Sequence, residues 1–310
     1  ASTDIKHGKL AVWAQVDNAI SHFESADSAA LGKVSAPRLA AFAHRVEELG
    51  YSTLWLPEAF GRNSFVASSW MLANTTRLQV ATGIVSIYSQ DALATRGSAD
   101  ALNEQSGGRF LLGLGVSHRE AVQGMRGHDY GKPLVAMRAY LDGIAASPYN
   151  ALAPAAPTPI VLAGLREKMI ELAAERANGT HTYNVTPGHT AMARSILGPD
   201  KLLCVEQPLI LETDPAKARR IARGELELYL GLVNYRNSWR ALGFEEEDFA
   251  NGGSDRLVDA VVGWGDAAAL RARIVEHLDA GATQVCIKAL ASDGSTDMRI
   301  FELLAAGSDN

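Results

Sequence analysis

The sequence predicts a β/α barrel of the TIM-barrel type, with eight parallel strands and a helical insertion between the seventh and eighth strands. Short apolar runs alternate with helical patterns along the chain. The runs are apolar on both faces, which is typical of parallel strands covered by crossover helices. The chain has 310 residues, of which 47% are hydrophobic, and such a barrel needs about 250 residues. We therefore expect a single domain over residues 1–310.

The first half of the chain contains the first four strand-and-helix pairs. Residues 10–14 form a short apolar run between polar residues, which predicts a buried strand. After Pro37, apolar residues recur at helical spacing until Gly50, and glycine commonly ends a helix. The alternation continues with strands at 53–56, 78–85 and 110–115 and helices at 65–74, 91–104 and 134–145.

The second half supplies the other four strands and the insertion. The stretch 215–280 has a helical pattern, with breaks at Gly243 and at residues 251–253. A segment rich in Pro and Ala, residues 148–159, resembles a linker, so a doubly wound sheet in two domains divided near Pro154 is the alternative. Strands are predicted at 160–163, 181–184, 202–211 and 285–289, and helices at 166–176, 189–196 and 298–305.

Composition argues against several classes of partner and location. The formal net charge is -6, and no run of Lys and Arg occurs, so nucleic acid is not expected as a partner. The chain has no stretch of about 18 apolar residues, and residues 1–9 do not resemble a signal peptide. Cys204 and Cys286 each lie in an apolar run, far from the spacing of a zinc or redox site. A reduced, cytoplasmic location is therefore expected.

The loops that follow the strands build the active site of a β/α barrel, because the strand ends converge at one mouth. Four such segments are rich in polar and small residues, and we expect them to surround one pocket. They are residues 57–62, 82–86, 113–119 and 163–168.

Two residues in these segments are candidates for acid and base chemistry. Glu58 and His118 follow neighbouring strands, where burial can bring a side-chain pKa close to neutral. Glu58 could instead pair with Arg62, and His118 could be a hydrogen-bonded bystander. The eight histidines are scattered and form no known metal motif, so no metal is expected.

Two further positions are candidates for cofactor contacts. Gly164 follows a strand and precedes a helix, an arrangement that can bind phosphate on free backbone N–H groups. The alternative is that Gly164 only fits a tight turn. Trp13 could flank an aromatic cofactor or belong to the core. Gly113-x-Gly115 lacks the third glycine of a dinucleotide motif, and Ser117-His118 lacks the pattern of a serine hydrolase.

Taken together, the segments resemble the luciferase-like monooxygenase superfamily, and within it the branch of oxidoreductases that depend on the deazaflavin coenzyme F420. The resemblance extends over nearly the whole chain. It rests on GYSTLWLPEAFGR, RLQVATGIVSIYSQDALATRGSADALNEQSGGRFLLGLGVSH, YGKPLVAMRAYLDGI, PIVLAGLREKMIELAAERANGTHTYNVTPGHT and HLDAGATQVCIK.

The resemblance implies a flavin or deazaflavin that lies across the strand ends, and usually a homodimer. It implies a non-prolyl cis peptide, here expected between Ile84 and Val85, against the ring. Some members carry a Glu-His or Asp-His pair after the second strand, where this chain has Glu58-Ala59, so proton transfer would fall to His118 or Glu58. By the same resemblance, the cofactor phosphate would lie at Ala163, Gly164 and Leu165, and the ring or its ribityl chain at Val116, Ser117 and His118.

Three functions follow from this resemblance. The first is hydride transfer between coenzyme F420 and an organic substrate. The second is an FMN-dependent monooxygenase that uses reduced flavin and oxygen. The third, from another class, is a flavin-binding protein without catalysis.

Overall fold

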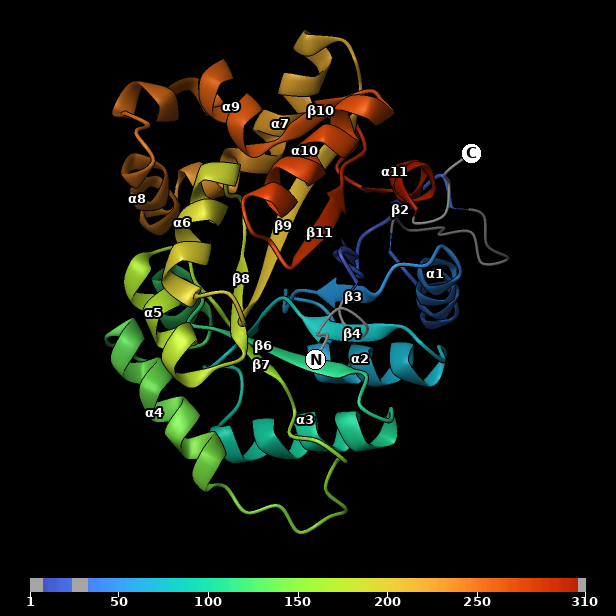
Figure 1. Cartoon of the computed structure of the whole chain (residues 1–310), viewed down its shortest axis with the longest axis vertical. Coiled ribbons are helices and arrows are strands. Elements are labelled where there is room, and N and C mark those ends of the chain that lie inside the picture. The colour runs from blue at the N-terminus through green and yellow to red at the C-terminus, as the bar shows by residue number, and fades with distance from the viewer. Residues whose placement is uncertain (1–7, 24–32, 306–310) are drawn as a thin grey trace.

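A computed structural model describes residues 8–23 and 33–305 of the chain (Figure 1). Its main sheet closes on itself, because β8 pairs with β9 as well as with β7. All pairings in this barrel are parallel, as in Val12↔Leu54 between β1 and β3. The barrel strands are β1 (Leu10–Trp13), β3 (Thr53–Leu56), β4 (Gln79–Thr82), β6 (Phe110–Gly115), β7 (Ile160–Ala163), β8 (Gly179–Thr182), β9 (Leu202–Leu211) and β11 (Gln284–Ala289).

Helices cover the outside of the barrel, as Figure 1 shows. The sequence predicted the strands at 53–56, 110–115, 160–163 and 202–211 with the bounds that the structure has. Because the barrel is closed, the two-domain alternative is wrong. The carbonyl of Pro159, at the end of the predicted linker, accepts a hydrogen bond from the N–H of Leu112 in β6. The covering helices are α1 (Ala36–Glu48), α2 (Ser64–Ala73), α3 (Ala92–Gln105), α4 (Pro133–Ala146), α5 (Glu167–Arg176), α6 (Pro187–Leu197), α10 (Ala267–Asp279) and α11 (Met298–Leu304).

The third predicted strand is interrupted. It ends at Thr82, and the separate short strand β5 (Val85–Ser86) pairs with β6 through Val85↔Leu114. A cis peptide bond lies between Gly83 and Ile84. The prediction of a cis bond was therefore displaced by one residue, since it was expected between Ile84 and Val85.

The sixth strand begins and ends two residues earlier than predicted, at Gly179 and Thr182 rather than over 181–184. A Cβ atom on Gly179 would lie 2.0 Å from the carbonyl oxygen of Leu202, so glycine permits the close approach of β8 to β9. Tyr183 lies beyond the last residue of β8 that pairs with β9, and Asn184 has a left-handed φ of 53°. Periodicity alone does not reveal such a shift, because glycine carries no apolar signal.

The insertion between β9 and β11 is mostly helical, as expected, and forms a second apolar cluster around Trp239 and Leu257. The prediction of a helical pattern through residues 215–280 was wrong at one place. The strand β10 (Gly263–Gly265) pairs with β9, and a Cβ atom on Gly263 would lie 2.7 Å from Leu209 Cδ2. The other insertion elements are α7 (Pro215–Leu230), α8 (Val233–Ala241), η3 (Glu246–Gly252) and α9 (Asp255–Val261).

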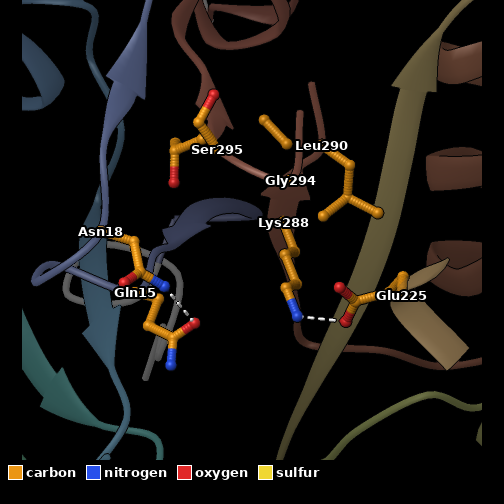
Figure 2. Close-up of a pocket in the computed structure, with 9 residues that line it drawn as sticks. Gln15, Asn18, Glu225, Lys288, Leu290, Gly294 and Ser295 are labelled. Atoms are coloured by element: carbon orange, nitrogen blue, oxygen red, sulfur yellow. Dashed lines mark hydrogen bonds and ion pairs between the residues drawn. The ribbon is translucent and has the colours of Figure 1, made fainter. Parts of the chain in front are cut away.

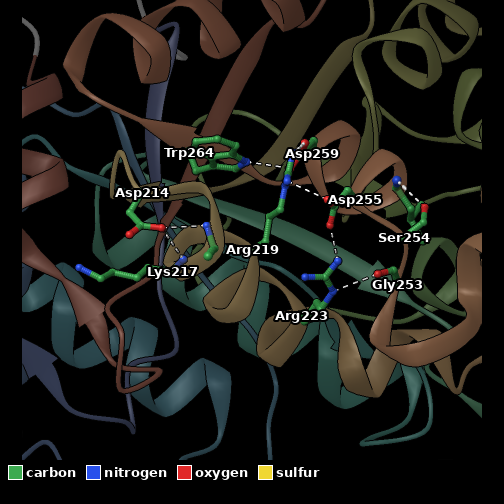
Figure 3. Close-up of polar contacts among 11 residues, drawn as sticks. Asp214, Lys217, Arg219, Arg223, Gly253, Ser254, Asp255, Asp259 and Trp264 are labelled. Carbon is green, nitrogen blue, oxygen red and sulfur yellow. Dashed lines mark hydrogen bonds and ion pairs between the residues drawn. The ribbon is translucent and has the colours of Figure 1, made fainter.

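Charged side chains join α7 to α9 (Figure 3). Arg219 pairs with Asp259 at 2.6 Å and with Asp255 at 2.7 Å. Arg223 pairs with Asp255 at 2.5 Å and donates to the carbonyl of Gly253 at 3.0 Å. These contacts hold the insertion together on its outer side. Two further short strands, β2 (Ile20–Ser21) and β12 (Thr296–Asp297), pair beside the barrel.

No helix within residues 8–23 and 33–305 combines the length and the apolar character that crossing a membrane requires. The expectation of one domain over residues 1–310 stays a prediction, because residues 1–7, 24–32 and 306–310 lie outside the described part of the chain.

Candidate active site at the barrel mouth

Alternate residues of the strands point into the barrel, and Trp13, Cys204 and Cys286 belong to one buried apolar cluster there. The same alternation brings one residue from each of several strands to the carboxyl end of the lumen. We call this set the mouth ring. Its members are Trp13, Gly83, Gly115, Ala163, Tyr183, Glu206 and Lys288.

One side of the mouth ring is built of Gly83, Gly115 and Ala163. A Cβ atom on Gly83 would lie 2.9 Å from Trp13 Nε1. A Cβ atom on Gly115 would lie 2.5 Å from Ile84 Cδ1 and 3.3 Å from Ala163 Cβ. The positions of Gly83 and Gly115 are therefore too tightly packed for a larger residue.

The other side of the mouth ring carries charged and hydroxyl groups. Lys288 Nζ donates to Tyr183 Oη at 2.7 Å and forms an ion pair with Glu225 of α7. Glu206 Oε2 accepts a hydrogen bond of 3.0 Å from the backbone N–H of Asn184. Burial raises the pKa of Glu206 to about 8, although the charge of Lys288 and the Asn184 N–H act in the opposite direction. Glu206 is therefore mainly protonated at neutral pH.

Several buried polar atoms at this mouth have no hydrogen-bond partner among the described residues. Buried polar groups are normally paired, so a group of unpaired ones indicates a binding site for a polar ligand. The unpaired atoms are Trp13 Nε1, His181 Nε2, Thr182 Oγ1, Asn184 Oδ1 and Nδ2, and Glu206 Oε1. Of these atoms, Trp13 Nε1 and His181 Nε2 lie beside Gly83 of the small side.

His181 lies just below the mouth ring, on β8. Its ring stacks on Trp55 with centroids 4.6 Å apart, and its Nδ1–H donates to the carbonyl of Cys204 at 3.1 Å. Burial lowers the pKa of His181 to about 4, so the ring is neutral at pH 7. With hydrogen on Nδ1, the unpaired Nε2 is an acceptor that faces Gly83, where a Cβ atom would lie 3.3 Å from it.

Glu58 lies next to the interrupted strand, as predicted. Its backbone N–H donates to the carbonyl of Ile84 at 3.1 Å, and its carboxylate accepts from the N–H of Ser86 at 3.1 Å. The carboxylate also forms an ion pair with Arg126. The alternative pairing with Arg62 is wrong, since Arg62 pairs with Asp17 at 2.6 Å.

His118 follows β6 and contacts the insertion. Its ring centroid lies 5.9 Å from that of Tyr235 in α8, and burial lowers its pKa. Ser117 has a left-handed φ of 57°, and its carbonyl accepts from Tyr130 Oη at 3.0 Å. Val116 is half-buried and packs against the main core. His118 is therefore neutral at pH 7, close to the aromatic side chains of the insertion.

The turn after β7 supports both interpretations of Gly164. Its N–H donates to the carbonyl of His181 at 3.2 Å, and a Cβ atom would lie 3.0 Å from Thr180 Oγ1, as expected for a tight turn. The N–H groups of Leu165, Arg166 and Glu167 donate to no acceptor in the part of the chain that the structure describes. Free N–H groups before a helix suit an anion, so Gly164 shapes the turn while its successors could contact a phosphate.

The chain also matches the model of a known family. A family model described as luciferase-like monooxygenase matches residues 18–284. The chain belongs to the luciferase-like monooxygenase family. Among residues 8–23 and 33–305 of this luciferase-like protein, no three His, Cys, Asp or Glu side chains are grouped as metal ligands.

Relatives of this luciferase-like protein use two kinds of cofactor. A provisionally named coenzyme F420-dependent oxidoreductase of Mycobacterium tuberculosis is 24% identical, over 81% of this chain and 90% of that protein. The F420-dependent tetrahydromethanopterin reductase of Methanopyrus kandleri superposes with a TM-score of 0.69 at 16% identity, over 96% of this chain and 97% of the other. The oxygenating constituent of 3,6-diketocamphane monooxygenase of Pseudomonas putida, in complex with FMN, gives a TM-score of 0.66 at 13% identity, over 94% and 97%.

Sequence reasoning missed the charged residues of the mouth ring. Glu206 stands in the run LLCVEQPLIL and Lys288 in QVCIKA, so each places a charge in a strand that is buried from both sides. A buried charge is costly unless it has a partner, and this was the available signal. Their neighbours Glu225 and Tyr229 carried no comparable signal, because they belong to an ordinary amphipathic helix.

Proposed function

We propose that this luciferase-like protein is an oxidoreductase that transfers a hydride between coenzyme F420 and an organic substrate. The observation that carries the proposal is the mouth ring, which combines a side of small residues with unpaired buried polar atoms. A flat ring with a polar edge fits such a surface. The named function of the Mycobacterium tuberculosis relative supports F420 as the cofactor.

The cofactor-binding residues that we propose come from separate strand ends. When bound, the deazaflavin would supply the carbon that gives or takes hydride, while the barrel orients it and excludes water. The side chains at the small side and at β5 would border the ring, the loop after β6 would border its ribityl chain, and the turn after β7 would hold its phosphate. In that order, these residues are Trp13, Ile84 and Val85; Val116 and Ser117; and Ala163, Gly164 and Leu165.

His118 and Glu58 are the two residues that the sequence predicts for the coupled proton. His118 is neutral at pH 7 because burial lowers its pKa, so it can accept a proton. Both carboxylate oxygens of Glu58 already have partners, since the carboxylate pairs with Arg126 and accepts from the N–H of Ser86. The contacts therefore favour His118 of the two.

An FMN-dependent monooxygenase is the second candidate. It is supported by the fold similarity to the FMN-bound Pseudomonas putida protein. FMN carries the same kind of ring and a phosphate, so the same strand ends would serve it. A flavin-binding protein without catalysis is the third candidate, and it would retain cofactor without turnover.

Titration of the purified protein with F420 and with FMN, followed by fluorescence, tests the proposal. We expect micromolar binding of F420 and negligible binding of FMN. The opposite result would contradict F420 as the cofactor and support FMN. Tight F420 binding without turnover on alcohols, ketones, imines and activated alkenes would favour the flavin-binding protein.

A homodimer and a cytoplasmic location are further proposals, which gel filtration with light scattering and cell fractionation would test.

A further inference from the structure

A chain of polar contacts crosses the polar side of the mouth ring. It begins at Glu225, passes through Lys288 and Tyr183, and ends at Tyr229, whose hydroxyl lies 2.9 Å from that of Tyr183. Glu225 and Lys288 also line a small pocket, which Figure 2 shows with the ion pair at one side and Gln15 at another. These contacts therefore run from the pocket to Tyr183, which lies at the lumen.

One hydroxyl hydrogen among these contacts has no acceptor. The ammonium of Lys288 can only donate, so the oxygen of Tyr183 accepts from it. The two phenols have two hydrogens, of which their mutual bond uses one. Neither hydroxyl has another partner in the described part of the chain, so either Tyr183 or Tyr229 presents a free O–H.

This free O–H lies beside the proposed ring site. The ring of Tyr183 lies 5.1 Å from that of Trp13 between centroids, and Lys288 Nζ lies 4.9 Å from the Trp13 ring. The rings of Tyr235 and Tyr229 belong to the insertion, have centroids 4.9 Å apart and cover Tyr183. The Tyr183 ring therefore lies between the Trp13 ring and the ring of Tyr229 in the insertion.

The groups around the phenols keep both the Tyr183 hydroxyl and the Lys288 amine protonated. Burial raises the pKa of Tyr183 well above its ordinary value, as do Tyr229, Glu225 and Glu206, so the hydroxyl is protonated. Burial acts most strongly and lowers the pKa of Lys288, but the charges of Glu225, Tyr229 and Glu206 and the hydrogen bond to Glu225 together raise it. Lys288 is therefore an ammonium at neutral pH and can return a proton to a phenolate.

We propose that the Tyr183–Tyr229 pair donates and accepts the proton that accompanies hydride transfer, that Lys288 connects the pair to the pocket, and that the substrate carries a polar C=O or C=N bond. This inference rests on the proposed function and names its substrate class. It assigns the tyrosines the contact with the reacting heteroatom, with His118 and Glu58 left to bind and orient the ligand.

The step balances as follows in the direction of reduction. When bound, the reduced deazaflavin would supply the hydride that forms a C–H bond at the carbon of the double bond, with its own C–H bond breaking, and the π electrons would move to oxygen or nitrogen. The heteroatom takes the phenolic hydrogen as the tyrosine O–H bond breaks. The phenolate takes a proton from the Lys288 ammonium, and the neutral amine takes one from water in the pocket. Oxidation of an alcohol or amine follows the reverse order.

The test begins with the F420-loaded wild-type protein and reduced F420 as hydride donor. The probes are acetone, butanal and a cyclic imine, and the return of the oxidised coenzyme's absorbance is followed from pH 6 to 9. We expect turnover and a normal solvent isotope effect. If the protein binds F420 but turns over none of these probes, the proton chain is overturned while the cofactor assignment stands. If it does not bind F420, the proposed function itself fails.

The variants Tyr183→Phe, Tyr229→Phe and Lys288→Met remove one member of the chain each. We expect Tyr183→Phe to lower kcat by about 100-fold or more with little change in KM and less than a twofold change in F420 affinity. Lys288→Met should change the pH profile of kcat. The control is Tyr51→Phe, since Tyr51 Oη donates to the carbonyl of Phe301 at 2.8 Å, away from the mouth ring. Tyrosine and lysine variants that keep kcat and its pH profile would overturn the proposal.

A measurement without cofactor checks the charge of Lys288. NMR of 15N-labelled lysine in the apo protein should show Lys288 as an ammonium at pH 7. Glu225→Gln should lower the pH at which it titrates, because the partner charge is lost. A neutral Lys288 at pH 7 in the wild-type protein would remove the proton source and overturn the proposal.

Discussion

Trp13 faces Gly83 so closely that a Cβ atom on the glycine would lie 2.9 Å from Trp13 Nε1. The same atom would lie 3.3 Å from Trp55 Cε3, so rigid indole rings surround the position from two strands. Neither indole can move freely, since Trp55 is fully buried and Trp13 is 4% exposed.

Gly83→Ala should therefore destabilise the protein by about 1–3 kcal/mol, as overpacking of a tight core does. Urea unfolding monitored by circular dichroism measures the change. We also expect weaker binding of F420, because the ring surface would be displaced. The matched control is Gly97→Ala in α3, where an added Cβ meets nothing within 4 Å. That change should stabilise the helix by up to about 1 kcal/mol, and an equal loss in both variants would contradict the explanation.

Glu206→Gln should change how stability depends on pH. In the folded protein the pKa of Glu206 is raised from 4.5 to about 8, mainly by burial. Above pH 4.5 the unfolded chain releases this proton while the folded protein keeps it, so folding loses up to about 1.4 kcal/mol per pH unit until pH 8. Glutamine is neutral throughout and avoids this loss.

The difference in unfolding free energy between Glu206→Gln and wild type should thus be small at pH 4.5 and favour the variant at pH 8, by an amount on the order of a few kcal/mol. Urea denaturation at both pH values provides the comparison. A difference that does not change with pH would show that Glu206 ionises normally in the folded protein.

His118→Ala and Glu58→Gln test the two residues predicted from sequence. If the tyrosine pair carries the proton, both variants should keep the solvent isotope effect and lose mainly affinity for cofactor or substrate. If His118 carries it, His118→Ala should lower kcat by about 100-fold or more at unchanged F420 affinity. Steady-state kinetics with fluorescence titration of F420 separates the two outcomes.

Arg219→Met should loosen the outer side of the insertion. Arg219 pairs with two aspartates and lies 5.7 Å from the centroid of the Trp264 ring. Because solvent screens these exposed charges, we expect a small loss of unfolding free energy that shrinks further in high salt. Arg138→Met, which removes an exposed pair with Glu175, should cost less. Thermal unfolding at low and high salt makes the comparison, and equal losses in the two variants would show that the network adds nothing.

The sequence predicted the barrel because its strands and helices carry the required periodicity over nearly the whole chain. Apolar runs such as FLLGLG, residues 110–115, are unambiguous when they are buried from both sides. Strand β10 escaped prediction because two of its three residues are glycines, which carry no apolar signal. The same reason explains the displaced start of β8 at Gly179.

The candidate site was predicted only in part. The strand ends brought Trp13, Ile84 and Ala163 together through the contacts around Gly83 and Gly115. The partner of Glu58 could not be derived, because Arg126 is 68 residues away in the sequence and reaches it only through the folded loop after β6. Lys288 and Glu225 are likewise joined across 63 residues. Pairings of this kind depend on tertiary geometry and leave no periodic trace.

The opening at the mouth ring is bordered by residues from two sources. Gly83, Gly115 and Ala163 belong to the barrel wall, where the gaps measured at the two glycines are too tight for larger side chains. Glu225 and Tyr229 reach the same opening from α7, a helix outside the wall. Directed evolution toward new substrates should therefore diversify positions of α7 other than Glu225 and Tyr229 and leave the glycines fixed, so that substrate selectivity changes while the proposed proton chain and coenzyme site are preserved.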